Sequence, residues 1–194
     1  MEILLIRHGL PLRVESDRPV DPPLAPKGHE QAGALARWLE DEPPDHLIAS
    51  TMNRAIDTAQ HLGDAFDLVT HQDEDFCEFD RGTHVYIPLE ELQRDDPHMV
   101  QLRADWFGAE GADRRADFQE RVVTALDRHL ADLDAERVAV VSHGGVINAT
   151  LARVLGTERE MFFAPAYTSV SRIIWNGKNF RLASINEAGH LRGL

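Results

Sequence analysis

The segment Glu2-Ile3-Leu4-Leu5-Ile6-Arg7-His8-Gly9 decides how this chain folds. Its apolar run has the length and composition of a buried strand, and it ends abruptly in an arginine, a histidine and a glycine. Such a strand carries a cation and an imidazole to the edge of a sheet, where open α/β folds bind ligands. We therefore expect Arg7 and His8 to belong to an anion-binding site, with Gly9 leaving room for the ligand.

A second run of the same kind, Val138-Ala139-Val140-Val141-Ser142, leads into His143-Gly144-Gly145. Two strands that both end in His-Gly indicate a site for histidine chemistry. The two histidines can meet only if their strands are neighbours in the sheet, which is a demand that coordinates can test.

The composition is that of one globular domain spanning residues 1–194. Apolar residues make up 43% of the chain, an ordinary share for a globular protein. No stretch approaches the roughly 20 apolar residues of a membrane span. The N-terminus has neither the basic region nor the cleavage site of a signal peptide, so we expect a cytoplasmic protein.

Charge and cysteine content restrict the partners further. The formal net charge of −13 disfavours nucleic acid and anionic membranes, since both require a positive surface. Cys77 is the only cysteine, which excludes an internal disulfide and fits a reducing compartment. It is most simply a small buried hydrophobe. Nothing in the sequence indicates an oligomeric state.

Periodicity predicts helices and strands in alternation along most of the chain. The expected strands are 2–7, 47–50, 67–70, 137–142, 169–175 and 179–186, and the expected helices are 26–40, 52–65, 114–133 and 145–155. This order predicts an α/β three-layer sandwich with a mostly parallel central sheet. The last two strands, separated by Asn176-Gly177-Lys178, form a hairpin that adds an antiparallel edge. Residues 80–115, with short helical pieces near 88–95 and 97–106, read as a lid-like insertion over the site.

Five motifs, taken in order, resemble the histidine phosphatase superfamily, also called the phosphoglycerate mutase-like family. Arg7-His8-Gly9 matches the family's N-terminal signature. The further matches are Leu24-Ala25-Pro26-Lys27-Gly28 with Gln31-Ala32, Ser50-Thr51-Met52-Asn53-Arg54-Ala55 with Thr58-Ala59, Phe76-Cys77-Glu78-Phe79-Asp80-Arg81-Gly82, and Ser142-His143-Gly144-Gly145. The resemblance covers residues 2 to about 155, and 186–191 resembles a common family ending. It implies the phosphoglycerate mutase-like fold and a phosphorylated small molecule as substrate, without cofactor or metal.

The resemblance also implies roles for individual residues. His8 would be transiently phosphorylated, which requires one neutral, aimed ring nitrogen while the other is held by an acceptor. Arg7 and Arg54 would hold the phosphate, because guanidinium groups pair with two oxygens at a time. His143, if cationic, would stabilise the same oxygens, and we count Gly144 beside it as phosphate-binding. Inorganic phosphate or sulfate is expected to occupy this cradle.

Expelling an alcohol from phosphorus at neutral pH requires a proton donor. Glu78 matches the family's donor position, and the same carboxylate would later deprotonate the attacking water. Asp80 is the substitute donor if Glu78 points away. The alternative is a solvated acidic loop with no special member, since Asp73, Glu74 and Asp75 are close in sequence. Ser50 and Thr51 are interpreted as a helix cap.

Two departures from the mutase pattern favour hydrolysis of a phosphomonoester. Leu10-Pro11-Leu12-Arg13 replaces the glutamate and asparagine that contact substrate in mutases, and Thr83-His84-Val85-Tyr86 replaces a tryptophan-glycine pair. His84 is the one further histidine that we expect near the pocket. Substrate choice would fall to residues 80–115, where the candidate contacts with an anionic tail are Arg81, Arg94, Arg103, Arg114 and Arg115.

Three alternatives remain open at this point. The first is a cofactor-dependent mutase, and the second is a binding module that holds a phosphorylated ligand without turnover. The third is a metal hydrolase with His8, His143 and Glu78 as ligands. Two permanently charged arginines would crowd a cation there, so electrostatics disfavour the metal.

Overall fold

The computed structural model describes residues 1–87, 97, 100–101, 111–159 and 161–194. Most of the expected lid-like insertion, including the helical piece near 88–95 and most of the one near 97–106, lies outside these residues. The strands are β1 (Glu2–Arg7), β2 (Val14–Glu15), β3 (His46–Ser50), β4 (Thr70–Asp73), β5 (Val85–Tyr86), β6 (Arg137–Ser142), β7 (Val170–Trp175) and β8 (Phe180–Glu187). The α-helices are α1 (Pro26–Trp38), α2 (Asn53–Phe66), α4 (Ala112–Leu130) and α5 (Gly144–Leu155), and the 3-10 helices are η1 (Glu74–Phe76) and η4 (Gly189–Leu191).

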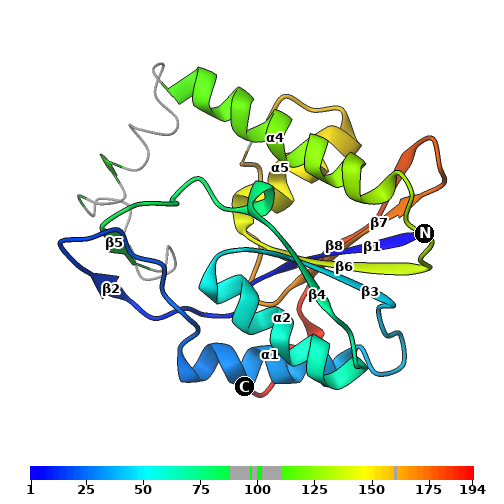
Figure 1. Cartoon of the computed structure of the whole chain (residues 1–194), viewed down its shortest axis with the longest axis horizontal. Helices are drawn as coiled ribbons and strands as arrows, with labels where there is room; N and C mark the ends of the chain where they lie inside the picture. Colours follow the sequence, from blue (N-terminus) through cyan, green and yellow to red (C-terminus); the bar gives the residue numbers. More distant parts are fainter. Residues whose placement is uncertain (88–96, 98–99, 102–110, 160) are drawn as a thin grey trace.

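The described chain is a three-layer α/β sandwich, as the sequence predicts. Six strands form the central sheet in the order β4-β3-β6-β1-β7-β8. The neighbours from β4 to β1 are parallel, and the β7–β8 hairpin is antiparallel. Figure 1 shows α4 and α5 covering one face of the sheet and α1 and α2 covering the other.

Alternating side chains of β1 build both halves of the core, because successive residues of a strand point to opposite faces. Ile3 and Leu5 belong to the apolar cluster under α4 and α5. Leu4 and Ile6 belong to the cluster under α1 and α2. The strand is thus buried on both faces, which fixes the position and direction of the residues that follow it.

The strand expected at 67–70 begins later than predicted, as β4 at Thr70. The reason is how α2 ends. Asp67 adopts the left-handed conformation at φ 53°, and the Leu68 N–H donates to the Gly63 carbonyl oxygen at 3.0 Å. Residues 67–69 therefore close the helix, and the extended backbone starts only after them.

The loop after β1 is more ordered than its composition indicates. Within it, β2 pairs with β5 in a small antiparallel sheet, and Pro11 bridges to Leu24. This brings residues 14–21 alongside 83–86, near the carboxyl edge of the central sheet. The sequence pattern contains no signal for this pairing.

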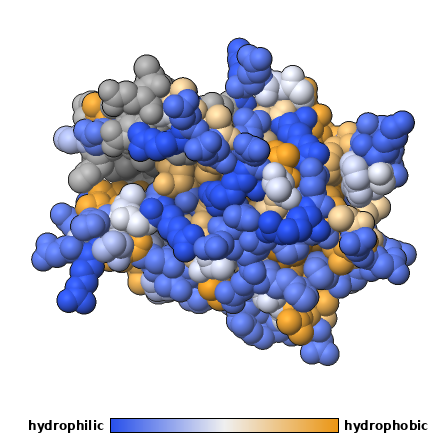
Figure 2. Space-filling view, turned by 45° about the horizontal axis from the view of Figure 1, so that its top comes forward, coloured by the Kyte–Doolittle hydropathy of each residue, from blue (hydrophilic) through white to orange (hydrophobic). Residues whose placement is uncertain are grey.

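One face of the molecule can be described by its hydropathy. The face in Figure 2 is largely hydrophilic, with small separate orange areas. Large hydrophobic side chains that are exposed, such as Val69 and Ile185, belong to separate elements of the chain. No helix among the described residues is long and apolar enough to cross a membrane.

Candidate active site

The site forms where three parallel strands end. In the sheet, β6 lies between β3 and β1, and Arg7 is in register with Ser142. His8 and His143 follow directly, and their ring centroids are 5.1 Å apart. The demand made by the sequence, that the two His-Gly strands be neighbours, is met.

The His8 ring is buried, with 2% of the residue exposed. Its Nδ1 lies 2.7 Å from the Gly9 carbonyl oxygen, and Arg54 Nε donates to its Nε2 at 3.3 Å. Burial, together with the charges of Arg54 and Arg7, lowers the pKa of His8 well below its ordinary value. The ring is therefore neutral near pH 7, with the proton on Nδ1 and the lone pair on Nε2.

Gly9 is required because the backbone of Gly28 packs against it, and not because a ligand needs the space as we expected. A Cβ there would stand 2.7 Å from the Gly28 carbonyl oxygen, and a Cβ at Gly28 would stand 2.2 Å from the Leu10 carbonyl oxygen. The two glycines let the first turn of α1 press against the chain just after His8. The space that we expected to serve a ligand is filled by backbone.

Arg54 reaches the site from the first turn of α2, with 1% of its surface exposed. Its Nη2 donates to both carboxylate oxygens of Asp80, at 2.9 and 3.1 Å. Its Nη1 is 3.8 Å from an Asp21 oxygen, and its guanidinium carbon is 4.6 Å from the ring centre of Tyr86. Burial acts to lower the pKa of Arg54, but Asp80, Tyr86 and Glu78 together act against it and the net shift is upward.

Arg7 is held by the segment that precedes β7. Its Nη1 donates to the Pro165 carbonyl oxygen at 2.6 Å, and its guanidinium carbon is 4.0 Å from the ring centre of Tyr167. The Tyr167 ring also lies 5.7 Å from that of His8. The segment before β7 therefore forms a wall of the site, which sequence patterns did not indicate.

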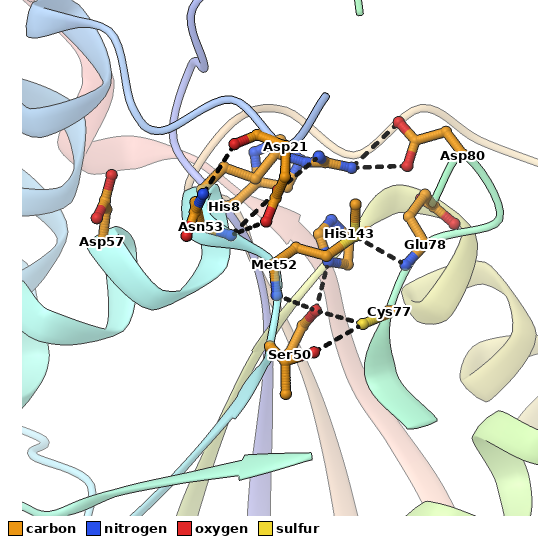
Figure 3. Close-up of polar contacts among 12 residues, drawn as sticks. His8, Asp21, Ser50, Met52, Asn53, Asp57, Cys77, Glu78, Asp80 and His143 are labelled. Carbon is orange, nitrogen blue, oxygen red and sulfur yellow. Dashed lines mark hydrogen bonds and ion pairs between the residues drawn. The ribbon is translucent and has the colours of Figure 1, made fainter. Parts of the chain in front are cut away.

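His143 is completely buried and bonds to the end of β3. Its Nε2 lies 2.8 Å from Ser50 Oγ (Figure 3), while its Nδ1 has no hydrogen-bond partner among the described residues. Burial and the charges of Arg54, His8 and Arg7 lower the pKa of His143 well below its ordinary value. In the unliganded site His143 is thus neutral near pH 7.

Ser50 does not cap the next helix, contrary to the sequence interpretation. Its Oγ accepts from the Met52 N–H, which lies before the helix begins. The first N–H of α2, that of Asn53, instead donates to the Asp21 carboxylate at 3.0 and 3.1 Å. The helix cap thus comes from the loop after β1, at a distance in sequence that local patterns do not reveal.

Glu78 points into the site and is 9% exposed. Its Oε2 accepts from the Gly145 N–H at 2.8 Å and its Oε1 from the Phe79 N–H at 3.1 Å. Burial, with a contribution from the charge of Asp80, raises the pKa of Glu78 to about 7. Asp80 is paired with Arg54. Glu78 is therefore the acid of this loop that is set apart by burial and a raised pKa.

Of the two glycines after His143, only Gly145 is needed to make room for the Glu78 carboxylate. A Cβ at Gly144 would meet only Pro165 Cδ, at an ordinary 3.8 Å, whereas a Cβ at Gly145 would stand 2.2 Å from Glu78 Oε1.

His84, which we expected near the pocket, is exposed. Across the described part of the chain, no group of three or more histidine, cysteine or acidic side chains has an arrangement that could hold a metal ion.

Comparison with known proteins agrees with this geometry. The model of the histidine phosphatase superfamily (branch 1) matches residues 3–188. The chain belongs to this superfamily. Enzymes of the superfamily among its relatives include the uncharacterized phosphatase PhoE of Bacillus subtilis, 24% identical over 98% of this chain and 97% of the relative.

Other relatives carry both phosphatase and mutase names. A probable phosphoglycerate mutase GpmB of Yersinia enterocolitica is 28% identical over 80% of this chain and 75% of the relative. Among solved structures, mycobacterial glucosyl-3-phosphoglycerate phosphatase has a TM-score of 0.71 at 25% identity, covering 96% of this chain and 98% of that one. Bacillus stearothermophilus YhfR has a TM-score of 0.75 at 24% identity, with 98% of both chains covered. This histidine phosphatase is therefore an enzyme of the phosphatase type.

Proposed function

We propose that this histidine phosphatase hydrolyses a small-molecule phosphomonoester through a phosphohistidine at His8, without a metal. The observation that carries the proposal is the state of the His8 ring. With Nδ1 bound to the Gly9 carbonyl oxygen 2.7 Å away, the lone pair of the ring is on Nε2. That lone pair accepts the Arg54 Nε–H in this structure, and it becomes free to attack phosphorus when Arg54 turns its hydrogen bond to a phosphate oxygen. Arg54 Nε lies beside His8 Nε2, where it can bind the oxygens of the incoming phosphate.

In the first step, His8 Nε2 forms a bond to phosphorus as the bond to the ester oxygen breaks. Glu78 gives its proton to the leaving oxygen, a role that fits a carboxyl group whose pKa is about 7. Arg7, Arg54 and His143, with Gly144 beside it, bind the three equatorial oxygens, on which negative charge is spread in the transition state.

In the second step, water attacks the phosphorus of phosphohistidine. The Glu78 carboxylate takes a proton from that water, the phosphorus–nitrogen bond breaks and inorganic phosphate leaves. Each proton that Glu78 gives in the first step thus returns in the second. His8 recovers its lone pair, and the site is ready for another substrate.

Trapping the intermediate tests the proposal. The purified protein, stripped of metal by a chelator, is mixed with a labelled phosphomonoester and quenched in base, which preserves phosphohistidine. We expect label on the wild type and on the control His71→Ala, which changes an exposed histidine, and none on His8→Ala. Turnover that persists in His8→Ala, or that stops with the chelator, would overturn it.

A mutase remains the second candidate, because some relatives are named as probable phosphoglycerate mutases. The products separate the two, since hydrolysis releases inorganic phosphate and a mutase yields an isomeric ester. A panel of sugar phosphates, nucleotides, phosphoglycerates and an aryl phosphate covers both. A clean preparation that turns over none of these favours the binding module. Substrate selection by residues 80–115 and a cytoplasmic location stay predictions.

A further inference from the structure

Ser50 contacts the second histidine of the site and has no part in the mechanism above. It is fully buried at the carboxyl end of β3, and its Oγ lies 2.8 Å from His143 Nε2. Figure 3 shows it below His143, with the label of His8 higher in the view. The two residues are 93 positions apart in sequence, so the contact depends on the pairing of β3 with β6.

The other contacts of Ser50 compete only weakly with His143 for its hydroxyl proton. The Met52 N–H donates to Ser50 Oγ at 3.2 Å, so this bond uses an oxygen lone pair. The remaining acceptor for the hydroxyl proton is Cys77 Sγ, at 3.6 Å. A thiol sulfur is a weak acceptor, and Thr51 Oγ1 is already 3.1 Å from the same sulfur. An imidazole nitrogen at 2.8 Å is the stronger acceptor.

The direction of this bond determines which tautomer His143 adopts. If Ser50 donates to Nε2, the ring proton must be on Nδ1. That atom is buried and has no hydrogen-bond partner among the residues that the structure describes. With the rings of His143 and His8 5.1 Å apart, an N–H there is available to an oxygen of a phosphoryl group on His8. The opposite tautomer would place a lone pair against that oxygen.

We propose that Ser50 is a positioning residue, whose hydroxyl donates to His143 Nε2 and so keeps the proton of the neutral ring on Nδ1 for the phosphate. The inference rests on the proposed function, because it assumes that a phosphoryl group binds between the two histidines. It gives the site a neutral donor that is in place before any anion arrives. His143 then needs no rearrangement when substrate binds.

The tautomer can be measured directly by nitrogen-15 NMR of the unliganded protein, with His143→Gln used to assign the signals. We expect His143 Nδ1 to have the chemical shift of a protonated nitrogen and Nε2 that of an unprotonated one. In Ser50→Ala, we expect this preference to be lost or reversed. A wild-type ring that carries its proton on Nε2 would overturn the proposal whether or not the enzyme turns over.

Kinetics give the second readout. Ser50→Ala should lower kcat by about ten- to a hundredfold, the range seen when the hydrogen-bond partner that orients a metal-bound histidine is lost, while the melting temperature checks the fold. Ser50→Thr, which retains the hydroxyl, should restore most of the activity. Equal kcat in wild type and Ser50→Ala, with full turnover in both, would overturn the role of Ser50 and leave the phosphatase proposal intact.

The chain offers a matched control in Ser142. This serine is also completely buried, stands next to His143 in sequence, and its Oγ has no hydrogen-bond partner among the described residues. Ser142→Ala should therefore change neither the tautomer nor kcat. An effect as large as that of Ser50→Ala would mean that any buried serine lost at this edge disturbs the site, which contradicts a specific role for Ser50.

Discussion

The Glu78 carboxylate lies directly against the backbone of Gly145, at the first turn of α5. Its Oε2 accepts the Gly145 N–H at 2.8 Å, and the absent side chain of Gly145 leaves the space that Oε1 occupies. The candidate proton donor is thus positioned by a helix that begins one residue after His143. One short segment, His143-Gly144-Gly145, therefore contributes to both parts of the site.

Gly145→Ala tests this contact. Its Cβ would stand 2.2 Å from Glu78 Oε1, so the carboxylate must move, and a displacement of about 1 Å at a reacting group can cost about a hundredfold in rate. We expect kcat/KM to fall by that order in a steady-state assay. Gly33→Ala in α1 is the control, because its Cβ would meet only flexible side chains, at 3.5 and 3.9 Å. Equal kcat/KM in the wild type and the Gly145 variant would contradict the placement of Glu78.

The pH dependence of kcat/KM should report the ionisation of Glu78. A proton donor must be protonated in the free enzyme, so activity should fall as pH rises through about 7, where burial places the pKa of Glu78. His8 does not produce an acidic limb near pH 6, because its pKa lies well below its ordinary value. Such a limb would come from the substrate phosphate, whose second pKa is about 6.

Glu78→Gln removes the titrating group and should lower kcat by about two to four orders of magnitude, the usual contribution of a general acid. Its remaining activity should no longer decline with pH near 7. If the variant retains the wild-type profile, another group supplies the proton, and Asp80 becomes the candidate to replace next.

Stability should depend on pH through the same residue. A folded-state pKa of about 7, against an ordinary value of 4.5, means that the folded protein retains a proton which the unfolded chain releases. The free energy of unfolding should therefore fall as pH rises from about 4.5 to about 7 and then level off. The full loss is up to about 3 kcal/mol.

Because the glutamine introduced by Glu78→Gln does not ionise, this variant should be more stable than the wild type at pH 8 and similar to it near pH 4.5. Urea denaturation at the two pH values measures both differences. A variant that is less stable than wild type at pH 8 would show that the buried carboxylate is well compensated, and that its pKa is not raised.

The main lines of the fold, and the meeting of His8, His143 and Arg54 at one edge of the sheet, could be predicted because their signal is local. The apolar runs before His8 and His143 identify two buried strands, and parallel strands bring their carboxyl ends to one edge. Arg54 follows the same logic, since it lies in the first turn of the helix after β3. The order of strands and helices then predicts the three layers.

The rest depends on contacts between distant segments, for which a single sequence carries no pattern. The bond between Ser50 and His143 exists only once β3 and β6 pair. Gly9 and Gly28 approach each other closely in the structure, but in the sequence they look like ordinary turn glycines. The capping of α2 by Asp21 and the β2–β5 pair likewise need the loop after β1 to return to the site.

Arg121 on α4 binds the backbone of the acid-bearing loop, so its replacement should disturb that loop. Its guanidinium donates to the carbonyl oxygens of Glu74, Asp75 and Cys77 at 2.8 to 3.0 Å, just before Glu78. Arg121→Ala removes the side-chain donor from the Asp75 and Cys77 carbonyls and one of the two donors from the Glu74 carbonyl, which also accepts the Cys77 N–H. The variant should lose about 2 kcal/mol of unfolding free energy, with a fall in kcat. Arg128→Ala, which removes the exposed ion pairs with Asp73 and Asp75, should cost at most about 1 kcal/mol and leave kcat unchanged. Urea denaturation and steady-state kinetics of both variants measure the difference, and equal effects would mean that the loop does not depend on Arg121 to place Glu78.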